Sequence, residues 1–261
     1  MAALAVSIFE DGPDSLHLQA LYNNKQDAQA ALARLNLSGA TEHFITQLPD
    51  EDWVAKSQAG LPPVEAGRFW IHGAHDADKI PTHIPWPVKI EAGAAFGTGH
   101  HGTTKGCLLI FDDLLKQNYR PNKILDLGCG AGTLAIAAAK ALSINILATD
   151  IDADAVSVTL QNANINKVGT YINALTANGF DSDALKDQQF DLIFANILAK
   201  PLMGLAPDIS KAMMAEGRVI LSGILAEQAE DVTQAFESLG LVIKPYPTLE
   251  GWTSLLGIKP A

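Results

Sequence analysis

The sequence is short of cysteine and of long apolar runs. Its two cysteines, Cys107 and Cys129, are fewer than a secreted scaffold usually carries, and they form no paired spacing. No run approaches the roughly 18 apolar residues of a transmembrane helix, and no charged segment leading into a long apolar run opens the chain. We therefore expect a cytoplasmic protein that has no membrane partner.

Basic residues are also scarce. Lys and Arg number 18 against 29 Asp and Glu, which gives a formal charge of −11. Because a nucleic-acid binder needs a basic face for the phosphates, direct nucleic-acid binding is not expected. The acidic balance is compatible with a basic protein as partner, although most acidic proteins are acidic only for solubility. The histidines match no zinc spacing and no cysteine pair accompanies them, so no metal is expected; they include His72, His75, His83, His100 and His101.

What the sequence does have is apolar content, 48% of 261 residues, enough for a sizeable core. Its pattern changes near residue 50. Residues 1–49 are expected to form a small α+β domain, ferredoxin-like but shortened, because its first strand and helix are missing. The expected strands are 3–9, 16–22 and 42–48, and the helix is 27–35. A short helix at 50–56 and the prolines that follow predict a linker over 50–75.

Residues 76–261 are predicted to form an α/β domain with a Rossmann-like sheet. Strands alternate with helices from residue 103 onward, which is typical of a mainly parallel sheet covered on both faces. The last two strands have a short connection, which predicts an antiparallel hairpin at the end of the sheet. Two strands, 68–72 and 87–91, are expected on the way into this domain. The further expected strands are 123–127, 144–149, 171–175, 190–195, 219–222, 241–246 and 252–258, and the helices are 103–115, 134–142, 153–164, 202–214 and 226–239.

A glycine-rich loop, residues 126–132, follows an apolar strand and opens a helix. Its glycines, Gly128 and Gly130 among them, allow a tight turn and close approach of a ligand to the backbone; a tight turn without a ligand is the alternative. Asp150 ends the next strand about 20 positions later, where a carboxylate can accept hydrogen bonds from both hydroxyls of a ribose. Alternatively, Asp150 and Asp152 are turn and N-cap residues of the following helix.

The details of this loop favour S-adenosylmethionine over a dinucleotide. A dinucleotide loop favours a third glycine where this chain has Thr133, and the third glycine falls at Gly132 instead. Asp126, just before the loop, is placed to hold the loop or to meet an ammonium group. A nicotinamide oxidoreductase on the same kind of sheet is the competing interpretation.

Four stretches together resemble the ribosomal protein L-eleven methyltransferases of bacteria. They are residues 95–104, 126–132, 149–152 and 195–199, and residues 221–225 are a weaker fifth match. The first and fourth stretches are far more specific than the loop. The resemblance implies a class I methyltransferase domain, a small substrate-recruiting domain, and S-adenosylmethionine as the cofactor. It implies lysine side chains of ribosomal protein L-eleven as the acceptors, with the N-terminal amine as a further candidate.

The resemblance also implies where the cofactor is held, at Thr104, Gly128, Asp150 and Asn196. Two departures bear on it. The family commonly has threonine, histidine and proline where this chain has His100, His101 and Gly102. In addition, the N-terminal region, which recognises the substrate in the family, is short.

Asn196 is the predicted catalytic residue. It ends a strand, where ligand crevices of such sheets lie, and its side-chain oxygen can accept a hydrogen bond from an amine, with the carbonyl of Ile197 or Leu198 as a second acceptor. The alternative is a helix N-cap. Thr104 is predicted to bond the methionine carboxylate at a helix N-terminus, unless it is an ordinary cap. Phe96 is predicted to pack on the methyl-bearing end of the cofactor, unless it packs in the core.

Two functional alternatives remain. One is methylation of a lysine or glutamine of another protein. Glutamine methylation usually goes with a proline-proline-aromatic run after the asparagine, whereas residues 197–199 here are Ile, Leu and Ala. The other is a non-catalytic S-adenosylmethionine-binding protein, against which the intact Asn196 motif argues.

Overall fold

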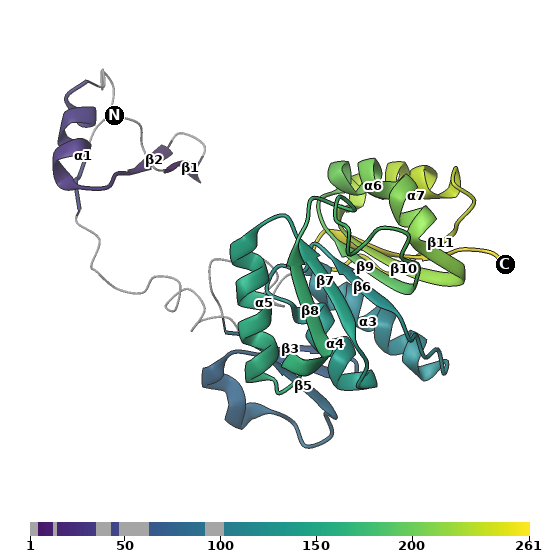
Figure 1. Cartoon of the computed structure of the whole chain (residues 1–261). Helices are drawn as coiled ribbons and strands as arrows, with labels where there is room; N and C mark the ends of the chain where they lie inside the picture. Colours follow the sequence, from purple (N-terminus) through teal and green to yellow (C-terminus); the bar gives the residue numbers. More distant parts are fainter. Residues whose placement is uncertain (1–4, 13–14, 35–42, 47–62, 92–101) are drawn as a thin grey trace. The chain divides into compact units, whose positions relative to one another are not determined.

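The computed structural model describes residues 5–12, 15–34, 43–46, 63–91 and 102–261 (Figure 1). The chain divides into two compact units, Met1–Asp52 and Trp53–Ala261. The short helix predicted at 50–56 and the loop that carries Phe96 lie outside the described residues. Within the described ranges, no helix is both long enough and apolar enough to cross a bilayer.

The first unit contains a hairpin followed by a helix, as predicted. Strand β1 (Ala5–Gly12) pairs antiparallel with β2 (Ser15–Leu21), and α1 (Lys25–Leu32) begins after an Asn24 cap that accepts from the Asp27 amide. The prediction of a third strand over 42–48 is wrong for its described part, 43–46, which has no strand pairing and leaves Phe44 81% exposed. A strand needs a partner to bond its backbone groups, and none of the described residues pairs with this segment.

The second unit is built on a seven-stranded sheet in the order β11-β12-β10-β9-β6-β7-β8. Strands β10 to β8 in that order are parallel, and β12 runs antiparallel between β10 and β11. Both the Rossmann-like sheet and the terminal hairpin are thereby confirmed. The strands are β6 (Ile124–Leu127), β7 (Ile146–Asp150), β8 (Ile172–Thr176), β9 (Phe190–Asn196), β10 (Met213–Leu225), β11 (Val242–Pro245) and β12 (Trp252–Ile258).

Helices cover both faces of this sheet (Figure 1). Successive strand residues point to opposite faces, so Ile124 and Phe194 belong to one core, whereas Leu125 and Ile193 belong to the other. Helices α3 (Gly102–Lys116), α4 (Thr133–Leu142) and α5 (Ala153–Ile165) pack on the first core, and α6 (Ala199–Ala212) and α7 (Ala229–Glu237) pack on the second.

A second, three-stranded sheet covers the outer side of α3 and α4. Strands β4 (Phe69–His72) and β5 (Trp86–Lys89) confirm predicted strands, whereas no strand is predicted from sequence at β3 (Val64–Ala66). Phe69 stacks on Phe111 of α3 at 5.7 Å between ring centroids, and Phe111 meets Phe194 of β9 edge-on at 5.3 Å. This aromatic row ties the small sheet through α3 to the central sheet.

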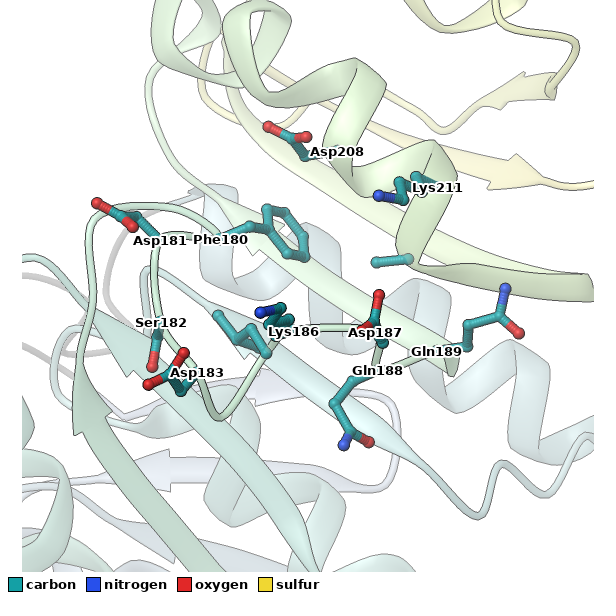
Figure 2. A pocket seen from close by; sticks show the side chains of 12 residues that line it. Phe180, Asp181, Ser182, Asp183, Lys186, Asp187, Gln188, Gln189, Asp208 and Lys211 are labelled. Carbon is teal, nitrogen blue, oxygen red and sulfur yellow. The ribbon is translucent and has the colours of Figure 1, made fainter.

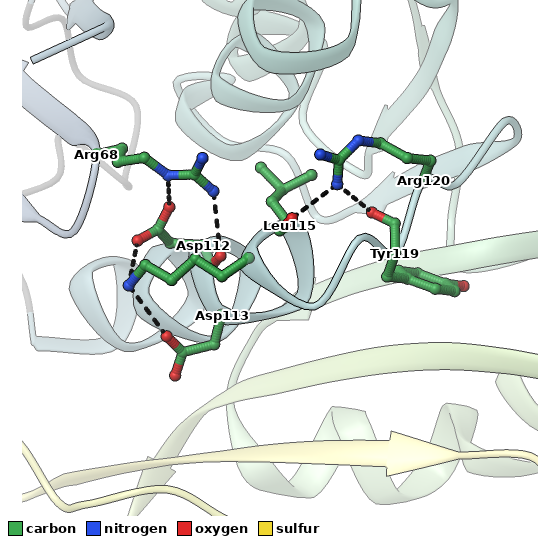
Figure 3. Close-up of polar contacts among 7 residues, drawn as sticks. Arg68, Asp112, Asp113, Leu115, Tyr119 and Arg120 are labelled. Carbon is green, nitrogen blue, oxygen red and sulfur yellow. Dashed lines mark hydrogen bonds and ion pairs between the residues drawn. The ribbon is translucent and has the colours of Figure 1, made fainter.

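An ion pair between Arg68 and Asp112 joins the small sheet to α3, and Lys116 of α3 completes the charge balance (Figure 3). Arg68 Nε donates to Asp112 Oδ1 at 2.5 Å, and Lys116 Nζ lies 2.8 Å from Asp112 Oδ2. The carboxylate is fully buried, so it needs these two cations. Just beyond the end of α3, Arg120 donates to the carbonyls of Leu115 and Tyr119. These contacts hold the C-terminal part of α3, the helix whose first turn belongs to the site.

Candidate active site at the carboxyl edge of the sheet

Three predicted site residues stand side by side because of strand register. Leu127 of β6 is aligned with Thr149 of β7 on one side and with Ala195 of β9 on the other. The next residue of each chain segment is therefore Gly128, Asp150 and Asn196 respectively, and neighbouring strands lie about 4.8 Å apart. Predicted positions spread over about 70 residues of sequence thus converge at one edge.

The glycine loop is folded onto the end of β7. The amides of Gly128 and Cys129 both donate to the Thr149 carbonyl, at 2.8 and 2.9 Å. Gly128, Gly130 and Gly132 have φ of 76°, 54° and 81°, a region that glycine adopts without strain. A Cβ on Gly128 would lie 2.4 Å from Cγ2 of Ile197, so the loop also packs closely against the segment that follows Asn196.

Asp150 holds the loop as well as facing the edge of the sheet. Its Oδ2 accepts from the Gly130 amide at 2.9 Å and its Oδ1 accepts from the Asp152 amide at 3.0 Å. Asp152, not Asp150, is the N-cap of α5, because its side chain accepts from the Asp154 amide. Asp150 is only partly buried, and an ionised carboxylate accepts about four hydrogen bonds. It therefore keeps acceptor capacity for a ligand.

Asn196 and Thr104, which are far apart in sequence, meet at the start of α3. Asn196 Nδ2 lies 3.4 Å from Thr104 Oγ1, a long hydrogen bond. Asn196 Oδ1 is buried and has no hydrogen-bond partner among the described residues. The N-cap of α6 is Leu198, so the structure does not support the alternative in which Asn196 caps that helix. A buried acceptor without a donor is costly unless a ligand supplies one.

The two backbone carbonyls considered as second acceptors are placed differently from Asn196 Oδ1. The Leu198 carbonyl accepts the first helical bond of α6, from the Leu202 amide at 3.0 Å. The Ile197 carbonyl lies against Gly223, where a Cβ would be only 2.2 Å from it. Of these three oxygens, Asn196 Oδ1 is the buried side-chain acceptor that no described donor reaches.

Ser222 supports this arrangement, a role that sequence reasoning missed, because the residue lies only in the weaker fifth match. It is aligned with Asn196 across β9 and β10, and it is fully buried. Its Oγ donates to the Thr103 carbonyl at 3.2 Å and lies 2.9 Å from Oγ of Ser254 in β12. The first turn of α3 is thus pinned to the sheet next to the Asn196–Thr104 contact.

Asp126 lies beneath the loop and is 1% exposed. Its Oδ2 accepts from the Ala135 amide in the first turn of α4 at 2.9 Å. Burial raises the pKa of the Asp126 carboxyl to about 7; the Ala135 hydrogen bond opposes this rise and the nearby Asp150 carboxylate adds to it. Asp126 therefore joins the end of β6 to the helix that follows the loop.

We expect Asp126→Asn to change how stability depends on pH. The folded-state pKa is about 7, above the unfolded value of about 4. The folded chain thus retains a proton that the unfolded chain loses, and stability falls as pH rises from about 4 to 7. The variant lacks this titration. Its free energy of unfolding, measured with urea on the ligand-free chain and taken relative to that of the original chain, should therefore rise from pH 5 to pH 8 by on the order of 3 kcal/mol. A difference that stays constant with pH would contradict the assignment.

A hollow of about 790 Å³ lies elsewhere, between the loop that follows β8 and the end of α6 (Figure 2). Figure 2 shows Lys186 and Asp187 of the loop near Lys211 of α6. None of the predicted site residues lines this hollow. The candidate site is therefore defined by the convergence of strand ends and not by the size of a cavity.

The residues at the sheet edge fit S-adenosylmethionine. The glycine loop lets a ligand lie close to the backbone, and the partly exposed Asp150 carboxylate can accept hydrogen bonds from ribose hydroxyls. Among the described residues, no group of three or more His, Cys, Asp or Glu side chains is placed to hold a metal ion.

Comparison with known proteins gives the same picture. The family described as "Ribosomal protein L11 methyltransferase (PrmA)" matches residues 6–260. A ribosomal protein L11 methyltransferase of Bradyrhizobium diazoefficiens is 45% identical, covering 95% of this chain and 81% of that protein. One of Brucella suis is 46% identical, covering 88% of this chain and 81% of that protein.

A solved structure agrees with these sequence relatives. The crystal structure of ribosomal protein L11 methylase from Lactobacillus delbrueckii subsp. bulgaricus superposes with a TM-score of 0.66 at 26% identity, covering 76% of this chain and 99% of that one. The family match spans nearly all of the sequence. The chain belongs to the ribosomal protein L11 methyltransferase family.

Proposed function

We propose that this protein transfers methyl groups from S-adenosylmethionine to lysine side-chain amines of ribosomal protein L11, with the N-terminal amine as a further acceptor. The observation that carries the proposal is the buried Asn196 Oδ1, an acceptor with no donor among the described residues, beside a glycine loop in a member of this family. The small N-terminal unit, residues 1–49, would recruit the protein substrate, as the family resemblance implies.

Four parts of the chain would hold the cofactor. Gly128 and Gly130 let it approach the backbone, and Asp150 accepts from the ribose hydroxyls. Thr104 lies in the first turn of α3, where the backbone amides at a helix N-terminus stabilise a carboxylate. Phe96, which lies outside the described residues, is proposed to pack on the methyl-bearing end.

Methyl transfer then depends on how the amine is held. When bound, S-adenosylmethionine would supply a methyl group whose bond to the sulfonium sulfur breaks as an amine nitrogen attacks in line, and the neutral thioether would be the leaving group. Asn196 Oδ1 would accept one N–H of the uncharged amine and so direct its lone pair. Burial of this oxygen keeps water from competing for the same hydrogen bond. A dry surrounding also disfavours the ammonium form, which helps the lysine to lose its proton.

Intact-mass spectrometry tests the proposal. Unmethylated ribosomal protein L11 is incubated with the full chain and S-adenosylmethionine, and its mass is expected to rise in steps of one methyl group. Matched reactions omit the cofactor or replace L11 with another basic ribosomal protein, and neither should gain mass. If calorimetry shows that the cofactor binds while L11 gains no mass, the proposed substrate is wrong. Peptide mapping of the product distinguishes lysine side chains from the N-terminal amine.

A further inference from the structure

Helix α5 has a row of polar side chains on the face that it buries. Thr159, Asn162 and Asn166 are spaced three and four residues apart, which places them on one side of the helix. Their exposed fractions are 0%, 0% and 8%. Buried polar side chains are expected to have partners, and a partner that belongs to a binding loop gives such a side chain more than a packing role.

Two of these side chains bond successive carbonyls of the glycine loop. Thr159 Oγ1 donates to the Gly130 carbonyl at 2.8 Å, and Asn162 Nδ2 donates to the Ala131 carbonyl at 2.9 Å. In a trans peptide the C=O and the following N–H point in opposite directions. Both bonds therefore turn loop carbonyls toward α5 and turn the amides of Ala131 and Gly132 away from it.

The same row also anchors the chain around β5. Asn162 Oδ1 accepts from the Glu91 amide at 3.1 Å, while Asn166 accepts from the Lys89 amide at 3.0 Å and donates to the Lys89 carbonyl at 2.6 Å. Asn162 thus links the glycine loop to the chain just after β5, whereas Asn166 bonds the last residue of β5 and its own helix and makes no hydrogen bond to the loop in the described structure. Only Asn162 therefore connects this region to the glycine loop.

We infer that Thr159 and Asn162 are positioning residues that hold the glycine loop in its ligand-binding conformation before the cofactor arrives. The inference rests on the proposed function, since it concerns S-adenosylmethionine at that loop. Gly132 requires a φ of 81° and faces Thr159 Cγ2, so the loop and α5 fit closely at this point. When a loop populates other conformations, the apparent affinity falls by the fraction of molecules that stay competent.

The test compares variants of the full chain by calorimetry with S-adenosylmethionine. Thr159→Val keeps the shape of the side chain and removes the hydroxyl, so we expect an affinity loss of about tenfold, equivalent to about 1.4 kcal/mol. Thr159→Ser keeps the hydroxyl and should restore most of the affinity. Asn162→Ala should also bind about tenfold more weakly. Asn166→Ala, which also removes a buried and hydrogen-bonded asparagine side chain, should bind within about twofold of the original chain while unfolding at lower urea.

Two further readouts separate positioning from a general loss of folding. Hydrogen exchange of the ligand-free chains should speed up in the loop segment for Thr159→Val and Asn162→Ala, but not for Asn166→Ala. The rate of methyl transfer at saturating cofactor should change little, because the reacting groups are untouched. If the original chain binds S-adenosylmethionine and both Thr159→Val and Asn162→Ala bind it with the affinity of the original chain, the inference is overturned and the proposed function stands. If the original chain does not bind S-adenosylmethionine, both are overturned.

Discussion

Replacing Asp150 by alanine is expected to weaken S-adenosylmethionine binding by more than about a hundredfold. The carboxylate is proposed to accept from both ribose hydroxyls, and each hydrogen bond to a charged group contributes about 1.5–3 kcal/mol. Since about 1.4 kcal/mol corresponds to a factor of ten, losing both bonds exceeds two orders of magnitude. Isothermal titration calorimetry on the full chain measures the effect directly.

The design must separate ribose binding from loop support, because Asp150 also accepts from the Gly130 amide. Asp150→Asn keeps one acceptor oxygen for the loop but removes the charge, so it should fall between the original chain and Asp150→Ala. Asp152→Ala is the matched control two residues away, since it removes only the cap of α5. This control should lose stability, on the order of 1 kcal/mol, and keep its affinity. Unchanged affinity in Asp150→Ala would sink the ribose assignment.

The regular part of the fold could be predicted because its signals are local. Buried parallel strands appear in the sequence as short apolar runs, and in the helices between them apolar residues recur every three or four positions. Strand β12 matches its predicted bounds, whereas α6 begins at Ala199 and not at the predicted Leu202. Pro201 does not prevent the earlier start, because a first-turn N–H has no helical acceptor to lose.

The small elements were predicted less well because they depend on distant partners. Strand β3 has three residues between prolines and Gly67, and only its pairing with β4 makes it a strand. The opposite error occurred over residues 43–46, where a β-prone stretch forms no ladder. Strand formation in short segments is decided by pairing and burial more than by composition.

The same distinction applies to the site. Gly128, Asp150 and Asn196 could be placed together from sequence, because the carboxyl ends of parallel strands share one edge. The residues that hold the glycine loop could not be predicted. Thr159 and Asn162 bond the loop because helix α5 packs against it, and sequence spacing does not reveal that packing. The available signal was a row of polar residues on the buried face of a helix, which usually indicates a specific set of partners.

Replacing Asn196 by alanine is expected to slow single-turnover methyl transfer by on the order of a hundredfold or more, while the affinity for S-adenosylmethionine changes little. The side chain ends β9 with Nδ2 near Thr104 Oγ1, and its buried Oδ1 is left to accept from the amine. Alanine removes that acceptor without filling its place, so the amine loses its orientation. Quenched-flow reactions with ribosomal protein L11 and saturating cofactor measure the transfer step itself.

The matched control is Asn178→Ala, an exposed asparagine that follows β8 at the same edge of the sheet and bonds none of the proposed site residues through its side chain in the described structure. It should transfer methyl groups at the original rate. Asn196→Asp supplies a sharper contrast, because a carboxylate accepts from the amine but also stabilises its ammonium form. Its transfer should be slow at neutral pH and recover as pH rises and the amine loses its proton. If Asn196→Ala transfers at the original rate, another group orients the amine; if Asn196→Asp is slow without any recovery, orientation by the amide matters more than the charge state of the lysine.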